Sequence, residues 1–189
     1  MKNQFWSIPN ILSLFRIALI PFIVWAYCIR RLYFMAVLIG VSALSDVLDG
    51  IIARKFNMVT SIGKALDPIA DKLTLFTLLV IMCFYLHSAA IILLCVLFTV
   101  KEVVMGIEGL LVIKKTGSTY SANVIGKATT VLLYANILLH ILFQEIPVWL
   151  SRVVIGASIL LVCVSLGVYT YQNLRRIKSG ENVENVGKN

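Results

Sequence analysis

The chain carries little charge for its length, and acidic residues are especially scarce. Only 14% of its 189 residues are charged, Asp and Glu together number 9, and hydrophobic residues make up 60%. The mean hydropathy is +0.94. Because soluble globular domains contain roughly 25% charged residues, this composition excludes a soluble domain and indicates an integral membrane protein.

Histidine and cysteine are too scarce and too scattered to form a recognisable metal or redox motif. The chain has two histidines and four cysteines, and each cysteine lies singly in an apolar run. None of the cysteine spacings matches a zinc site or a redox pair. We therefore interpret the cysteines as small packing residues and expect the chemistry to rest on other side chains.

Long apolar stretches recur six times, each with room for the roughly 20 residues that a bilayer crossing needs. We expect an all-α integral membrane fold with six transmembrane helices, preceded by a short interfacial N-terminal segment. These helices would form one membrane domain over residues 1–175, and residues 176–189 would form a polar cytoplasmic tail. The expected spans are about 10–29, 32–53, 67–85, 89–112, 121–143 and 148–172.

The basic residues gather near the ends of these spans. If the N-terminus is cytoplasmic, ten of the 17 Lys and Arg residues fall on cytoplasmic segments, three on the opposite side and four within spans. The positive-inside rule then predicts a multi-pass protein of the cell membrane with both termini in the cytoplasm. The net charge of +8 is explained by topology and anionic lipid headgroups, so we expect no nucleic-acid partner.

All four aspartates of the chain lie within 26 residues. Asp46 and Asp49 are three residues apart, and Asp67 and Asp71 are four apart; on a helix both spacings place the two side chains on one face. Each pair lies in or beside an apolar run, where carboxylates are costly and mark function. Two helices that direct these pairs at one point would require cations or protons to offset the like charges.

Two classes of function fit such a cluster. Carboxylate oxygens suit hard cations such as Mg²⁺ or Mn²⁺, and carboxylates that bridge two metals support displacement at phosphorus. Gly50 and Gly63 would let a substrate approach the acids closely, and Arg54 suits phosphate oxygens. The alternative class is an ion or proton-coupled transporter, because paired intramembrane carboxylates also line ion pathways.

The stretch from Asp46 to Asp71 resembles the signature of the CDP-alcohol phosphotransferase family at every fixed position. It reads Asp-x-x-Asp-Gly-x-x-Ala-Arg, then eight residues, then Gly-x-x-x-Asp-x-x-x-Asp. The resemblance implies transfer of a phosphatidyl or similar group from a CDP-linked donor to an alcohol, with release of CMP. It also implies that Asp46, Asp49, Asp67 and Asp71 bind two divalent cations, and that Asp71 is the general base.

By the same resemblance, the donor site would include Gly50, Arg54, Thr60 and Gly63. The opening Pro-Asn-x-x-Ser-x-x-Arg is similar to that of many lipid-synthesising members, which implies that Asn10 and Ser13 face the nucleotide.

The opening segment also has a simpler interpretation. Pro9 marks a helix start and Asn10 lies near the membrane interface. Arg16 lies one turn into an apolar run and needs a partner or a water-filled cavity.

Among the branches of the family, the chain is most similar to the bacterial phosphatidylglycerophosphate synthases. That similarity implies CDP-diacylglycerol as the donor, glycerol 3-phosphate as the acceptor, and a homodimer. Lys127 and Lys101 would then bind the acceptor phosphate. The alternatives are that these lysines extend to the membrane surface or that Lys101 pairs with a nearby acid.

The sequence departs from that branch in the fourth expected span, and these differences are consistent with a second acceptor alcohol. Lys101-Glu102 stands in place of Arg-Glu, and Glu108 stands near the position of a further arginine. With fewer cations for an acceptor phosphate, a cardiolipin synthase that uses phosphatidylglycerol is the alternative within the family.

Overall fold

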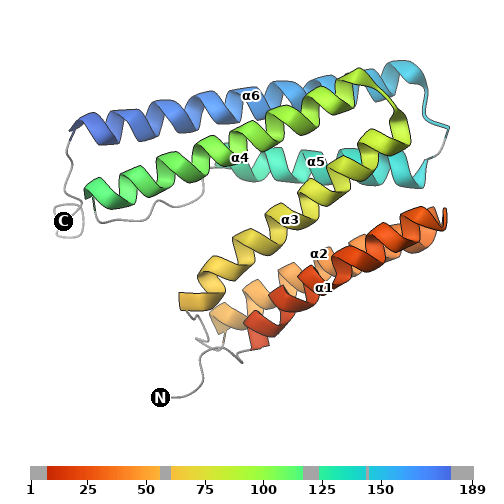
Figure 1. The fold of residues 1–189 in the computed structure, drawn as a ribbon, viewed down its shortest axis with the longest axis horizontal. Coiled ribbons are helices and arrows are strands. Elements are labelled where there is room, and N and C mark those ends of the chain that lie inside the picture. The colour runs from red at the N-terminus through yellow and green to blue at the C-terminus, as the bar shows by residue number, and fades with distance from the viewer. Residues whose placement is uncertain (1–7, 56–60, 117–123, 144, 180–189) are drawn as a thin grey trace. The chain divides into compact units, whose positions relative to one another are not determined.

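The computed structural model describes residues 8–55, 61–116, 124–143 and 145–179. Over these ranges the chain forms six helices and no strand, which confirms the all-α prediction (Figure 1). The helices are α1 (Ile8–Cys28), α2 (Leu32–Lys55), α3 (Ser61–Leu86), α4 (Ala89–Thr116), α5 (Val124–Leu142) and α6 (Val148–Ser179).

Five of these helices, all except α2, are long and apolar enough to cross a membrane. Helix α2 has 24 residues, and the apolar stretch found among its described residues is Leu32–Asp46. Large apolar side chains are exposed along the helices, for example Phe22 at 57% and Leu110 at 70%. Such exposure suits contact with lipid tails and not with water.

The third helix begins earlier than the sequence suggested. The sequence predicts a span over about residues 67–85, and an apolar span of Leu66–Leu86 is found, but helix α3 itself begins at Ser61 and contains Pro68. Proline inside a membrane helix is tolerated when neighbouring groups satisfy the freed backbone. As a result, Asp67 and Asp71 lie one turn apart on a continuous helix, and residues 61–64 are helical.

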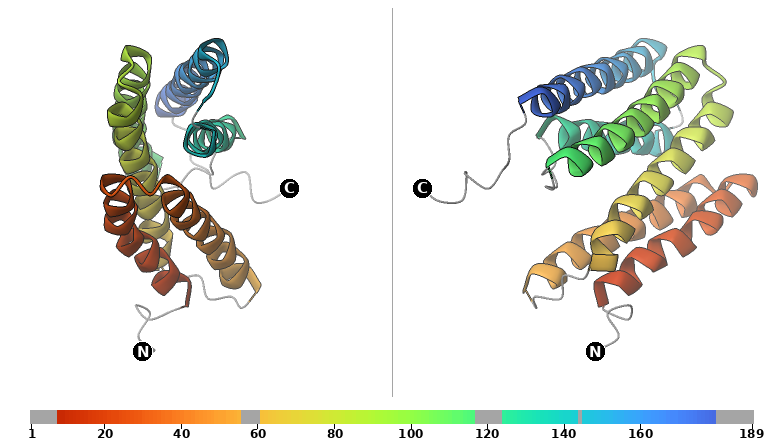
Figure 2. Two further views of the ribbon diagram at one scale, coloured as in Figure 1. Left: turned by 90° about the vertical axis from the view of Figure 1, so that its right-hand side faces the viewer. Right: turned by 60° about the vertical axis from the view of Figure 1, so that its left-hand side comes forward.

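The described helices pack as two compact units. The first contains α1, α2, α3 and the end of α5 from Ile137; the second contains α4, α6 and the start of α5 up to Asn136. Within the first unit, α1 packs along both α2 and α3 (Figure 2). Within the second, α4 and α6 lie side by side (Figure 1). Helix α1 is therefore the common neighbour of the two helices that carry the aspartates.

A tight turn after α1 reverses the chain, so that α2 runs back alongside α1. Arg30 adopts a left-handed conformation with φ of 56°. Its N–H donates to the carbonyl of Tyr27 at 2.9 Å, and the N–H of Arg31 donates to that of Ala26 at 3.0 Å. These two hydrogen bonds define a Schellman C-cap. The chain reverses within a few residues, so the start of α1 lies level with the end of α2.

Candidate functional site

One arginine connects all four aspartates. The Arg16 side chain, on the third turn of α1, is only 2% exposed. Its Nη1 donates hydrogen bonds to Oδ1 of Asp46 and Oδ1 of Asp71. Its Nη2 donates to Oδ2 of Asp49 and to Oδ1 of Asp67, each at 2.7 Å. The partner that an arginine in an apolar run requires is therefore the complete set of aspartates.

The helical spacings account for this convergence. Asp46 and Asp49 lie on one face of α2 near its end, and Asp67 and Asp71 lie on one face of α3 near its start. The antiparallel turn between α1 and α2 brings Arg16 to the level of the first pair, and the packing of α1 on α3 brings it to the second. The predicted meeting of two carboxylate pairs is present in the structure.

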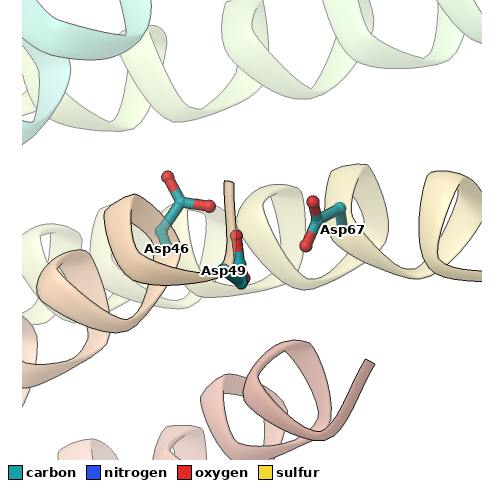
Figure 3. Close-up of side chains that lie close together, drawn as sticks. All are labelled: Asp46, Asp49 and Asp67. Carbon is teal, nitrogen blue, oxygen red and sulfur yellow. The ribbon is translucent and has the colours of Figure 1, made fainter. Parts of the chain in front are cut away.

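Three of the carboxylates form a geometry that fits a hard cation. One oxygen each from Asp46, Asp49 and Asp67 lies within 4.8 Å of the other two. Figure 3 shows these side chains gathered between α2 and α3. An all-oxygen ligand set of this kind suits Mg²⁺ or Mn²⁺. Asp71 joins the cluster through its hydrogen bond from Arg16.

The cluster is closed on one side and accessible on another. The Asp49 side chain is 1% exposed, whereas those of Asp46, Asp67 and Asp71 are 43–45% exposed. Asp49 and Arg16 therefore form the buried base of the cluster. The other three carboxylates are the ones that a substrate can approach.

Ser13 supports the cluster from one turn before Arg16. Its hydroxyl donates to Oδ1 of Asp67 at 2.6 Å, and it is buried together with Asn10. Because Asn10, Ser13 and Arg16 are three residues apart, they lie along one side of α1. Ser13 thus has a structural role in holding Asp67, and contact of Asn10 and Ser13 with a nucleotide stays a prediction.

The remaining donor-site predictions fall mostly beyond what is described. Gly50 and Arg54 lie in the last turns of α2, but the surroundings of Gly50 and the side chain of Arg54 are outside the described part, and Thr60 lies in the undescribed range 56–60. Gly63 lies in the first turn of α3. The roles of these four residues stay predictions.

Lys101 has an acidic partner in its own helix. It is 3% exposed, its Nζ lies 2.9 Å from Oε1 of Glu102, and the same atom lies 5.6 Å from the centre of the Phe98 ring. The pairing considered as an alternative to acceptor binding is therefore present. A role of Lys101 in binding an acceptor stays a prediction and would require this pair to open.

Lys127 is exposed and lies in the first turn of α5. The preceding residue, Gly126, faces Tyr169 of α6 so closely that a Cβ would lie 2.9 Å from the tyrosine Oη. Tyr169 is itself buried. The absence of a side chain at Gly126 therefore leaves room for the Tyr169 ring next to the start of α5.

Glu108, which departs from the related branch, has a structural partner. Nδ2 of Asn173 donates to its Oε2 at 2.9 Å, and Asn173 is buried. This hydrogen bond joins α4 to α6. The sequence does not indicate this contact, because 65 positions separate the two residues and no helical periodicity relates them.

We expect Glu108 and Asn173 to be energetically coupled in the folded protein. A double-mutant cycle of Glu108→Ala and Asn173→Ala, followed by unfolding in detergent, should give a coupling free energy of about 0.6–1.7 kcal/mol. Glu108→Gln keeps an acceptor oxygen and is the matched control, with a smaller loss. Additive effects of the two alanine substitutions would contradict a structural role for this hydrogen bond.

The chain matches the profile of one protein family and is similar to several named proteins. The profile of the family described as CDP-alcohol phosphatidyltransferase matches residues 6–168. A protein of Aquifex aeolicus (strain VF5), named CDP-diacylglycerol--glycerol-3-phosphate 3-phosphatidyltransferase, is 31% identical over 175 residues, which cover 90% of this chain and 98% of the relative.

Shorter alignments link the chain to other proteins of the same name. One from Pectobacterium atrosepticum is 35% identical over 103 residues, which cover 53% of this chain and 57% of the relative. One from Rickettsia bellii is 47% identical over 70 residues, which cover 35% of this chain and 39% of the relative.

Proposed function

The chain belongs to the CDP-alcohol phosphatidyltransferase family, and on this basis we propose that it transfers a phosphatidyl group from CDP-diacylglycerol to glycerol 3-phosphate. CMP is the second product. The family membership confirms the resemblance inferred from the aspartate pattern. The observation that carries the proposal is the convergence of all four aspartates of the chain on one point. The names of the similar proteins support the choice of donor and acceptor.

We propose that Asp46, Asp49, Asp67 and Asp71 hold two divalent cations, Mg²⁺ or Mn²⁺. The support is the all-oxygen ligand set and the 4.8 Å limit on three of its oxygens. When bound, such cations supply Lewis-acid stabilisation of the pyrophosphate charge.

The proposed reaction is a displacement at the phosphorus that bears diacylglycerol. A hydroxyl oxygen of the acceptor forms the new bond to this phosphorus, and the bond from phosphorus to the bridging oxygen of the pyrophosphate breaks. The hydroxyl proton passes to a carboxylate that acts as general base. Burial excludes Asp49, whose side chain is 1% exposed, and the family resemblance selects Asp71, at 45%.

In this proposal, different residues bind the donor and the acceptor. We assign the CDP part of the donor to Gly50, Arg54, Thr60 and Gly63, with Asn10 and Ser13 nearby. We assign the acceptor phosphate first to Lys127, because it is exposed and has no ion pair among those found in the described residues. Lys101 is the second choice, because its ammonium already pairs with Glu102.

The proposed enzyme crosses the membrane six times. At about 1.5 Å per residue, the 24 residues of α2 extend roughly 36 Å, enough to cross a hydrocarbon core of about 30 Å. The aspartates would then lie at the cytoplasmic face, near soluble glycerol 3-phosphate, with both termini on the same side. We further propose one domain over residues 1–175, a polar tail over 176–189, and a homodimer.

Purified protein should convert labelled CDP-diacylglycerol to phosphatidylglycerophosphate when Mg²⁺ or Mn²⁺ and glycerol 3-phosphate are supplied. Asp71→Asn should lower the rate by about 10²–10⁴-fold, because it removes the general base. Thin-layer separation of the lipid products and measurement of released CMP provide the readout. A chelator should abolish the reaction, and added Mn²⁺ should restore it.

A parallel reaction with phosphatidylglycerol separates the two acceptors. Cardiolipin formed there, without phosphatidylglycerophosphate in the first reaction, would replace the proposed acceptor by a lipid. If neither reaction released CMP, the transferase assignment would be wrong for this chain, and ion transport by the aspartate cluster would be the hypothesis to test.

Lys127→Gln should raise the KM for glycerol 3-phosphate about tenfold or more and change kcat less, because a lost charge-assisted hydrogen bond to phosphate weakens acceptor binding. Lys114→Gln, an exposed lysine at the end of α4, is the matched control and should leave KM unchanged. Steady-state kinetics at saturating donor measures both parameters. Equal KM values in the two variants would exclude Lys127 from acceptor binding.

A further inference from the structure

Arg16 lies at the buried base of the aspartate cluster and contacts one oxygen of each carboxylate. We propose that Arg16 is an internal counter-cation of the cluster that competes with divalent metal for the same carboxylate oxygens, so that metal binding displaces its guanidinium. This inference rests on the proposed function, in which the four aspartates hold divalent cations. It adds that the chain supplies its own competitor for that site.

The overlap follows from the distances. Nη2 of Arg16 lies 2.7 Å from an oxygen of Asp49 and 2.7 Å from an oxygen of Asp67, so it bridges α2 and α3. Mg²⁺ binds carboxylate oxygens at about 2.0–2.1 Å, and a metal that bridges the same two oxygens from this side would collide with Nη2. The guanidinium and a bridging metal therefore exclude each other there.

Burial makes displacement of Arg16 costly. The side chain is 2% exposed, and its Nε is buried with no hydrogen-bond partner among the described residues. The four carboxylates thus provide all the hydrogen bonds that are found for this guanidinium. Because a buried charge that loses its partners is strongly destabilising, Arg16 should lower the affinity of the substrate-free site for metal.

The same contacts should stabilise the metal-free protein. Four carboxylates close together repel one another unless a cation offsets their charge, and Arg16 is the cation that contacts each of them. Removing its charge should therefore have two effects of opposite sign. The metal-free fold should become less stable, while the affinity for metal should rise. A purely structural arginine would give a loss in both.

The test compares Mn²⁺ affinity in nucleotide-free protein, measured from the electron paramagnetic resonance signal of free Mn²⁺. Arg16→Met should bind Mn²⁺ roughly tenfold more tightly or better than the unchanged protein, because an opposing charge within a few ångströms is gone. Its thermal midpoint without metal should fall, and the rise of that midpoint on adding Mn²⁺ should exceed that of the unchanged protein.

Two control variants test whether the effect requires loss of a positive charge at the aspartate cluster. Arg31→Met removes an exposed cation at the other end of α1 and should leave Mn²⁺ affinity unchanged. Ser13→Ala removes a neutral hydrogen bond to Asp67 and should not tighten binding. If Arg16→Met does not fold without metal, Arg16→Lys carries the test. A single ammonium lacks the two nitrogens that share the four aspartates, so this variant should bind Mn²⁺ several-fold more tightly.

The outcomes distinguish this inference from the proposed function. Equal or weaker Mn²⁺ binding by a folded Arg16 variant would overturn competition by Arg16 while leaving the metal site in place. Absence of Mn²⁺ binding by both the unchanged protein and a folded Arg16 variant would overturn the metal site itself, and with it the role of Arg16. Tighter binding by the variant, with CMP release still dependent on metal in the unchanged protein, would support both.

Discussion

Four carboxylates held close together among apolar helices need a cation, and the rest of the first unit is arranged to meet that need. Arg16 supplies the charge from α1, and its guanidinium contacts one oxygen of each aspartate. Helix α1 packs on both α2 and α3, so one side chain can reach both acid pairs. The burial of Arg16 and Asp49 below three accessible carboxylates gives the cluster a closed base and an open side, as a phosphoryl-transfer site requires.

Much of this site was predictable because its pattern is local. Spacings of three and four residues place Asp46 with Asp49 and Asp67 with Asp71 on single helix faces, and the scarcity of other acids makes the set conspicuous. The sequence also indicated that Arg16 needs a partner, but it did not identify the aspartates as that partner. Arg16 is 30 positions from Asp46 and 55 from Asp71, and only the packing of α1 against both helices brings them together.

The failures have equally specific causes. The third membrane span lies where it was expected, but helix α3 begins at Ser61 and continues through Pro68, because membrane helices tolerate internal proline. Glu108 looked like a missing arginine, and its hydrogen bond from Asn173 depends on the side-by-side packing of α4 and α6. For Lys101, pairing with a nearby acid was one of two alternatives, and the structure shows Glu102 as its partner. Polar contacts between distant helices depend on tertiary packing, which helical periodicity does not encode.

The most direct test of the account is the anomalous scattering of a crystal of the protein grown with Mn²⁺. We predict two peaks about 3.5–4 Å apart, both bounded by Asp46, Asp49, Asp67 and Asp71, with the Arg16 guanidinium moved off the oxygens that the metals bind. A structure in which Mn²⁺ binds elsewhere, or in which Arg16 keeps all four carboxylates at saturating Mn²⁺, would contradict it.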